Sequence, residues 1–369
     1  MTLPASGAIS MSQVNTELGL TASTLISLNQ ANVRGLFGVP SGTISMSQGY
    51  GKSNYQLGST WTYRSGLSAT GWGTSTNAGS NGLAFFNNRF VVGGISGRIA
   101  YSSDGITWTY VNTLVGQGWP STYSAVTAMG AGTNLCIVGS QNAEIGTSPD
   151  GMTWTYRSGL KATTFGATSV FGLAHSGSIW VACGISGKIA TSPDGITWTY
   201  RAGLSATGWT TASDVRAVFW NGTQFIAAGS SGKYATSPDG ITWTYKGQIP
   251  GLTSATLWRI QKSSSGLYLF LGTSNECATS PDLVTWTNRT ALLQAKASVS
   301  APLSVVWDGG KFVIGHGSSS KKITTTVDGS AFTLYTIATT PAFNDPVTMA
   351  FGAGKLVSVG NTGSAMTSP

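Results

Sequence analysis

The stretch Thr191-Ser-Pro-Asp-Gly-Ile-Thr-Trp-Thr-Tyr200 decides how this chain of 369 residues is built. Near-copies of it recur along the chain, and one aromatic residue holds the same place in every copy. These aromatics lie 43 to 46 residues apart: Trp108, Trp154, Trp198, Trp243, Trp286 and Phe332. A fixed period in this range is typical of stacked supersecondary units, and it fits a blade of four strands. The repeat therefore predicts a β-propeller.

The shared pattern Ser-x-Asp-Gly-x-Thr-Trp, called a box below, resembles the Asp-box of sialidase-like and related β-propellers. A short carboxylate in a tight turn can accept backbone N–H bonds, and glycine tolerates the positive φ that such a turn needs. Leu283 replaces this glycine in the fifth copy. Because a near-identical acid stands in almost every copy, we interpret the acids as turn residues rather than catalytic acids or metal ligands. They are Asp104, Asp150, Asp194, Asp239, Asp282 and Asp328.

The fourth copy shows how a whole blade is read from the sequence. An apolar stretch over Arg216–Trp220 ends at Asn221-Gly222, the strongest short signal for a hairpin. Further strands are expected over Gln224–Gly229, Lys233–Ser237 and, as the outer strand, Ile241–Lys246. Short strands at regular spacing, with no helical period, predict four-stranded antiparallel blades.

The two ends of the repeat predict how the ring closes. Residues Ala365–Pro369 match the first half of a box, whereas Ser59–Arg64 match a second half with no beginning. Joined, these segments complete one more blade and remove an open sheet edge. The predicted fold class is therefore all-β: a seven-bladed β-propeller over residues 57–369, closed by an N-terminal outer strand that completes the C-terminal blade.

Residues 1–56 are expected to form a separate small domain with short helices. Three Ser-x-x-Gln words recur in it, beginning at Ser10, Ser27 and Ser45. This word is a capping box, in which the Ser side chain caps a helical N–H and the Gln side chain reaches back. Helices are expected over Met11–Leu18 and Leu28–Arg34, with a single turn after the third word.

The segments Leu3–Gln13 and Pro40–Ser53 resemble a segment that recurs in structural proteins of tailed-bacteriophage virions, where it precedes unrelated C-terminal modules. The resemblance implies that residues 1–56 attach the chain to other virion structural proteins. It also implies a location in the virion, after assembly in the host cytoplasm. The alternative is an ordinary helical cap on the propeller.

The composition narrows the function classes. Only 9% of the residues are charged, with a formal net charge of +8. No segment reaches the roughly 18 apolar residues of a membrane span, and residues 1–19 lack the pattern of a signal peptide. We expect neither membrane insertion nor a nucleic-acid partner. The cysteines fall on predicted strands without metal-ligand spacing, and we expect buried free thiols, with a Cys136–Cys183 bridge left open: Cys136, Cys183 and Cys277.

The resemblance to sialidases raises the question of sugar hydrolysis, which needs paired acids, or a tyrosine with an acidic partner. Outside the boxes the acids are Glu17, Glu144, Asp214, Glu276, Asp308 and Asp345. Glu144 and Glu276 share one repeat position, and Asp308 lies in a hairpin turn. Asp214 and Asp345 remain, both in loops. No sialidase arginine triad is recognisable, and the two histidines stand in different repeats. We therefore expect no enzyme, no cofactor and no metal.

Basic residues also follow the repeat. One set comes three residues after the box aromatic: Arg64, Arg157, Arg201, Lys246 and Arg289. A second set begins the third strand: Arg98, Lys188, Lys233 and Lys322. We expect both sets on the face opposite the boxes, beside the loop aromatics Trp72, Trp119, Phe165 and Trp209. Charge pairing and ring stacking would there suit an anionic host-surface glycan. A solvated basic rim is the alternative.

These observations predict a non-enzymatic structural protein of a tailed-phage virion, in a tail, collar or capsid appendage. The N-terminal domain would dock to the particle and the propeller would be displayed, with adhesion to host glycans as one use of the display. A carbohydrate-binding lectin not tied to a virion is the alternative, followed by a glycosidase. The sequence does not indicate an oligomeric state.

Overall fold

The computed structural model describes residues 10, 13–15, 28, 33, 61–65, 67, 72, 82–111, 114–120, 124–202, 204, 208–210, 212–297, 301–317, 321–337, 348–360 and 364–368. The chain divides into two compact units, Met1–Leu57 with Pro369, and Gly58–Ser368. In the described part of the chain, no helix is long and apolar enough to cross a membrane.

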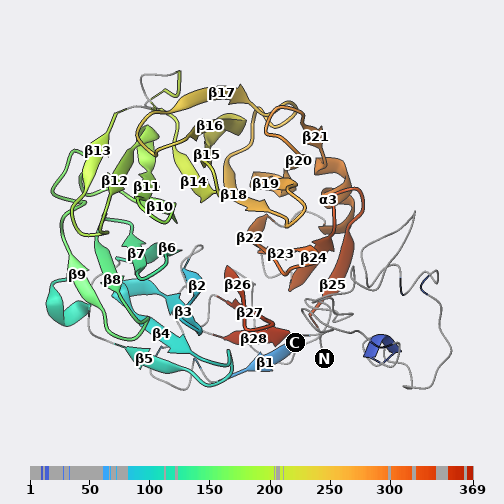
Figure 1. Cartoon of the computed structure of the whole chain (residues 1–369), viewed down its shortest axis with the longest axis horizontal. Coiled ribbons are helices and arrows are strands. Elements are labelled where there is room, and N and C mark those ends of the chain that lie inside the picture. Colours follow the sequence, from blue (N-terminus) through green and yellow to red (C-terminus); the bar gives the residue numbers. More distant parts are fainter. Residues whose placement is uncertain are drawn as a thin grey trace. The chain divides into compact units, whose positions relative to one another are not determined.

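The larger unit is a seven-bladed β-propeller (Figure 1). Its described strands form seven sheets of four, and neighbouring strands are antiparallel. The first three sheets are β2 (Leu83–Phe86), β3 (Arg89–Gly93), β4 (Ile99–Ser102) and β5 (Thr109–Val111); β6 (Val126–Ala131), β7 (Cys136–Ser140), β8 (Ile145–Ser148) and β9 (Thr155–Arg157); and β10 (Val170–His175), β11 (Trp180–Gly184), β12 (Ile189–Ser192) and β13 (Thr199–Arg201). The next three are β14 (Val215–Trp220), β15 (Phe225–Gly229), β16 (Lys233–Ser237) and β17 (Thr244–Gln248); β18 (Leu257–Lys262), β19 (Tyr268–Gly272), β20 (Cys277–Ser280) and β21 (Thr287–Asn288); and β22 (Pro302–Trp307), β23 (Phe312–His316), β24 (Lys322–Thr326) and β25 (Thr333–Thr336).

The seventh sheet is composed of strands from both ends of the unit. Its order is β1 (Thr62–Arg64), β28 (Ala365–Ser368), β27 (Lys355–Val359) and β26 (Thr348–Gly352). β1 runs antiparallel to β28, with Thr62 opposite Thr367 and Arg64 opposite Ala365 (Figure 1). We expect this pairing to hold the ring closed, so that loss of β28 should destabilise the propeller.

The strands of the fourth blade lie close to the stretches expected from the sequence. β16 begins and ends at the expected residues, and β15 begins one residue later than expected. The outer strand β17 begins at Thr244 rather than at Ile241. The reason is local: the N–H groups of Ile241 and Thr242 bind the carboxylate of Asp239, so these residues belong to the turn.

One helix in the propeller contradicts the expectation of no helical period. α3 (Thr290–Ala297) follows the outer strand β21 and buries Leu293 and Ala297. The fifth box ends in Asn288, where the complete copy has a tyrosine, and Oδ1 of Asn288 accepts the N–H of Thr290 at 2.8 Å. A polar side chain of this kind starts a helix, and the Ala, Leu and Gln that follow favour it. Five short 3₁₀ turns complete the helical elements of the described part of the propeller: η3 (Ile95–Gly97), η4 (Val115–Gln117), η5 (Ile185–Gly187), η7 (Ser230–Gly232) and η8 (Thr273–Asn275).

The core lies between neighbouring blades. The box residue Trp154, which precedes β9, packs with Phe86 and Val91 of the preceding blade in one buried cluster. The three cysteines are buried free thiols, so no Cys136–Cys183 bridge is present, and burial raises the pKa of each thiol: Cys136, Cys183 and Cys277.

In the smaller unit, the first Ser-x-x-Gln word has the geometry of a capping box. The N–H of Ser10 donates to Oε1 of Gln13 at 2.7 Å, and the N–H of Gln13 donates to Oγ of Ser10 at 3.2 Å. Residues 13–15 are helical and Val14 is buried. Of the word that begins at Ser27 only Leu28 is described, in a turn, and the word at Ser45 lies outside the described residues.

Candidate functional site

The box turns hold their aspartates by backbone hydrogen bonds. In the complete copy, Oδ1 of Asp194 accepts the N–H groups of Ile196 and Thr197 at 2.8 and 2.7 Å. Oγ of Ser192 accepts the N–H of Gly195 at 2.8 Å, and this glycine has a φ of 72°. Four other boxes repeat both carboxylate bonds: Asp104, Asp150, Asp239 and Asp282. These bonds are those expected of turn residues.

The pKa of all six box carboxyls is lowered. For four of them the largest single influence is partial burial, which raises the pKa, but hydrogen bonds from two N–H groups and a serine together outweigh it: Asp104, Asp150, Asp194 and Asp239. For Asp282 the backbone bonds come first, and for Asp328 the hydroxyl of Ser330 does. These carboxylates are therefore kept ionised by the turns that they bind.

The expectation that the loop aromatics are exposed for sugar stacking is wrong. Trp72, Trp119 and Trp209 are 0%, 1% and 0% exposed, and Phe165 is 0% exposed. Each packs on a glycine in or next to a second strand or the 3₁₀ turn after it: a Cβ added to Gly94 would lie 2.7 Å from the ring of Trp72. Added Cβ atoms would lie 2.5 Å from Trp119 at Gly97, 2.7 Å from Phe165 at Gly184 and 3.0 Å from Trp209 at Gly229. The rings are therefore buried packing residues and not exposed surfaces for sugar stacking.

The basic residues that begin the third strands are also engaged with these loops. The guanidinium of Arg98 donates to the carbonyl of Trp72 at 2.6 Å, and the ammonium of Lys188 donates to the carbonyl of Phe165 at 2.7 Å. The ammonium of Lys233 donates to Oγ of Ser213 at 2.8 Å. These cations hold the same loops in which the buried aromatics lie.

The arginines three residues after the box aromatic do not reach the face opposite the boxes. Arg201 pairs with Ile189, but its Nε donates to Oγ1 of Thr191 at 2.8 Å, two residues nearer the box turn. The same bond joins Arg64 to Thr367, Arg157 to Thr147 and Arg289 to Thr279. A Cβ added to Gly329 of the next box would lie 3.5 Å from Cγ of Arg289. The side chains run back because the threonine hydroxyl lies on the same side of the sheet. Lys246, by contrast, is exposed.

Glu144 stands at the start of the third strand of its blade, at the repeat position where other blades have a basic residue such as Lys188. It is 1% exposed, lies 2.5 Å from Nζ of Lys161 and accepts the hydroxyl of Tyr156. Burial and the hydrogen bond from its hydroxyl to Glu144 raise the pKa of Tyr156 to about 12. This cluster fixes its loop in the way that the lysines do in other blades.

The three remaining acids that the structure describes are also engaged. Glu276 accepts the hydroxyls of Ser254 at 3.2 Å and Thr273 at 3.3 Å. Asp214 lies 2.8 Å from Nη2 of Arg216 and accepts the N–H of Ser186 at 3.0 Å. Asp308 accepts the N–H groups of its hairpin turn, and burial raises its pKa. Glu17 and Asp345 lie outside the described residues. Of the two acids that the sequence leaves open for catalysis, Asp214 is therefore a structural ion-pair partner.

The two histidines lie in different environments. His175 stacks on Trp180 with the ring centroids 4.5 Å apart. His316 is fully buried, with its ring nitrogens 3.2 Å from Oδ1 of Asn275 and 2.8 Å from Oγ1 of Thr324. Among the described residues, no group of three or more His, Cys, Asp or Glu side chains could hold a metal ion.

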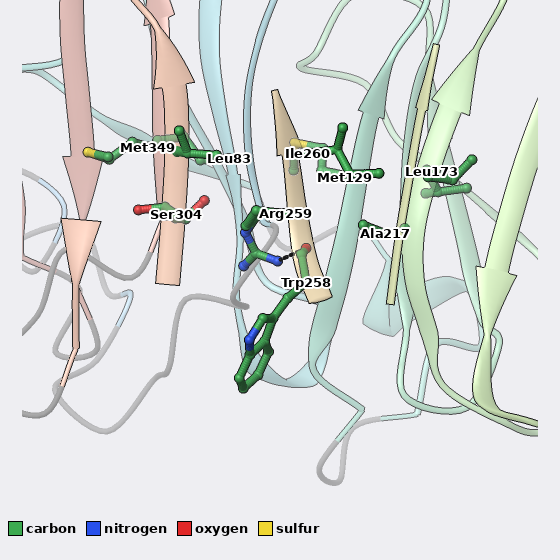
Figure 2. Close-up of a pocket in the computed structure, with 13 residues that line it drawn as sticks. Leu83, Met129, Leu173, Ala217, Trp258, Arg259, Ile260, Ser304 and Met349 are labelled. Atoms are coloured by element: carbon green, nitrogen blue, oxygen red, sulfur yellow. Dashed lines mark hydrogen bonds between the residues drawn. The ribbon is translucent and has the colours of Figure 1, made fainter. Parts of the chain in front are cut away.

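A cavity of about 200 Å³ lies where the first strands of all seven sheets meet. Its wall has two levels (Figure 2). One level is apolar and includes Leu83, Met129, Leu173, Ile260 and Met349. The other level holds Arg259 with Ser304 and Ala217, and Trp258 lies beyond it, toward the start of β18.

Arg259 is the charged residue among the described residues that line this cavity. It is 8% exposed, its Nη1 donates to the carbonyl of Trp258 at 2.7 Å, and burial lowers its pKa to about 10. The indole N–H of Trp258 is buried and makes no hydrogen bond. The axial cavity therefore presents a buried cation and an unused N–H donor, which makes it the best candidate site for a ligand.

The sequence contains a signal for this site that the repeat conceals. Five first strands bulge after their first residue, and Arg259 directly follows the bulge in β18. The equivalent positions in the other four are small: Ala128, Gly172, Ala217 and Ser304. Arg259 is therefore visible in the sequence as a departure from the repeat, and not as one of the recurrent basic residues.

Comparisons with known proteins define the fold. No protein-family model and no curated protein sequence matches this chain. The solved structure of YCF48 bound to D1 peptide is similar, with a TM-score of 0.60 and 12% sequence identity over 84% of this chain and 96% of that chain. YCF48 from Cyanidioschyzon merolae has a TM-score of 0.57 and 14% identity over 84% and 98% of the two chains. The computationally designed protein Ika8 has a TM-score of 0.53 and 14% identity over 80% and 96%. At these identities the similarity shows the seven-bladed β-propeller fold alone.

Proposed function

We propose that this chain is a non-enzymatic structural protein of a tailed-phage virion, whose residues 1–56 dock to the particle and whose propeller is displayed. The observation that carries the proposal is the N-terminal segment: its Ser-x-x-Gln words resemble those of phage structural proteins. The capping-box bonds between Ser10 and Gln13 support the interpretation of the words as helix starts. The division of the chain near Leu57 supports a separate attachment unit.

The engagement of the described acids supports a role in binding rather than catalysis. The box carboxylates bind turn N–H groups, Glu144 binds Lys161, and Asp214 binds Arg216. The proton donor of sugar hydrolysis is an acid with a raised pKa, whereas the box carboxyls have lowered pKa values and stay ionised. The displayed propeller would then recognise a host-surface ligand without transforming it, and its axial cavity is the part best suited to that recognition.

The attachment is tested by particle incorporation. The full chain and a variant lacking residues 1–56 are produced in cells that are assembling the phage particle, and purified particles are probed for each protein. We expect the full chain in the particles and the shortened variant in the soluble fraction, folded as judged by its circular dichroism. A matched variant of the full chain, Ser10→Ala with Gln13→Ala, should reduce incorporation because both capping bonds are lost. Incorporation of the shortened variant at the level of the full chain would contradict the proposal.

A further inference from the structure

We propose that the axial cavity binds a short aliphatic carboxylate, with the carboxylate against Arg259 and the alkyl chain against the apolar level of the wall. The inference concerns the propeller alone and holds whether or not residues 1–56 attach to a virion.

The first step is the exceptional position of Arg259. In four other blades the position after the bulge carries Ala128, Gly172, Ala217 or Ser304, so the fold needs no long side chain there. A structural cation would be expected to recur with the repeat, as the loop-holding cations at the third-strand position do. Arg259 occurs once, at a cavity wall, which points to a task that is not part of building the blade.

The second step is the chemistry of the polar level. A guanidinium presents N–H donors in a planar fork that matches a carboxylate, and the two together form strong, charge-assisted hydrogen bonds. Burial strengthens this attraction because the local dielectric is low. The indole N–H of Trp258, buried and without a hydrogen-bond partner, is a further donor at the same end of the cavity (Figure 2). Ser304 adds a hydroxyl to this level of the wall.

The third step is the size and polarity of the rest of the wall. The cavity volume of about 200 Å³ is below the roughly 300–1,000 Å³ of pockets for drug-sized ligands, so it suits a small molecule or a single side chain. Beside the polar level lie Leu83, Met129, Leu173, Ile260 and Met349 (Figure 2). The hydroxyl groups of a sugar acid would lose their hydrogen bonds with water against these side chains, whereas an alkyl chain would not. These side chains give the alkyl chain of an aliphatic acid apolar contacts close to the guanidinium.

The experiment measures binding of butyrate to the full chain by isothermal titration calorimetry, with butyramide as its uncharged isostere. We expect saturable butyrate binding, and butyramide should bind about tenfold more weakly or worse because its interaction with the guanidinium is not charge-assisted. Glucuronate and inorganic phosphate are titrated in the same way, to test a sugar acid and a phosphate as ligands of the cavity. Tighter binding of either one than of butyrate would overturn the assignment to an aliphatic acid.

Two variants locate the site. Arg259→Met keeps most of the side-chain volume and removes the charge, so butyrate affinity should fall about tenfold or more. Lys262→Met removes the same charge from the same strand, outside the residues that line the cavity, and should leave affinity within about twofold of the parent. Equal binding of butyrate and butyramide to the parent, or no binding of butyrate, would refute the proposal even if Arg259→Met fails to fold. Parent-like binding by a folded Arg259→Met variant would do the same.

Discussion

The sequence repeat is kept at the outer part of the ring and is broken at its axis. At the box turns, the same residue types make the same bonds in blade after blade: Asp194 and Asp239 each accept the N–H groups two and three residues ahead. At the axis, the position after the bulge is a small residue in β6, β10, β14 and β22 but Arg259 in β18. Five of the six box carboxylates make this pair of bonds, and the sixth, Asp328, binds the N–H and hydroxyl of Ser330 instead, whereas the axis carries a charged residue in place of a small one.

This difference separates residues that build blades from residues with another task. Every blade must close the same turn and fill the same gap to its neighbour, so residues that meet these needs recur. A ligand at the axis needs a recognition group only once, because all seven blades share one cavity. In a repeat protein, internal recurrence therefore indicates structure, and a break in the recurrence at a cavity indicates function. Most of the recurrent basic residues follow the same rule, since they hold a threonine, a serine or a loop carbonyl, and Lys246 is the exposed exception.

The largest loss of stability is expected in the seventh sheet, which combines β1 from the start of the propeller with β26, β27 and β28 from its end. Deleting residues 360–369 removes β28 together with its buried side chains Ala365 and Met366. It also leaves β1 and β27 with open edges. We expect the free energy of unfolding to fall by about 5 kcal/mol or more, the sum of lost core burial and edge pairing. Urea denaturation measures the loss, and deletion of Pro369 alone is the control. A midpoint close to that of the parent would show that the composite sheet is dispensable.

The next effect compares a tryptophan of the periphery with one of the axis. Trp198 is buried between blades and its indole N–H donates to the carbonyl of Gly195 at 3.2 Å. Trp198→Ala should lower the free energy of unfolding by about 3–5 kcal/mol. Trp258→Ala should cost clearly less, because this side chain is half-buried and its N–H has no hydrogen bond to lose. Equal losses in urea denaturation would remove the distinction between the two regions.

A smaller effect is expected from a single box carboxylate. Asp194→Ala leaves the N–H groups of Ile196 and Thr197 without their acceptor. The cost should be about 1–3 kcal/mol, with no change in butyrate binding at the axis. Thermal unfolding followed by circular dichroism gives the first value and calorimetric titration the second. A loss of binding equal to that of Arg259→Met would show that the two regions are not separate in function.

The smallest loss of stability per residue is expected when acid protonates the box carboxyls. The pKa of each box carboxyl is lower in the folded chain than in the unfolded chain, so its stabilisation is present above the ordinary Asp value of about 3.9 and is lost as pH falls below it. Urea midpoints should fall between pH 5 and about pH 3, and Asp194→Asn should weaken this dependence. Asp308 has the opposite effect on the pH dependence, because burial raises its pKa and its contribution to stability grows as pH falls. Asp308→Asn should make the fall steeper, and a shallower fall would contradict this assignment.

Much of the fold could be predicted because its signals are local. The Asp-Gly turn, the Asn221-Gly222 hairpin and the 43-to-46-residue step each depend on residues close in sequence. The main local errors arose where a side chain redirects the backbone, as Asp239 delays β17 and Asn288 starts α3. The candidate site could not be predicted in the same way. The loop residues Trp72, Trp119 and Trp209 are apolar rings that sequence alone cannot assign to a surface or a core.

The sequence by itself determined the period, the turn chemistry and the number of blades, because these follow from hydrogen bonds and dihedral preferences within a few residues. Only the tertiary structure decided which recurrent cations are already engaged and which side chains meet at the axis. Leu83, Ile260 and Met349 stand far apart in the chain, and the ring brings them to one cavity beside Arg259. Burial and room for a ligand are properties of such distant contacts, so they appear only once the blades are assembled.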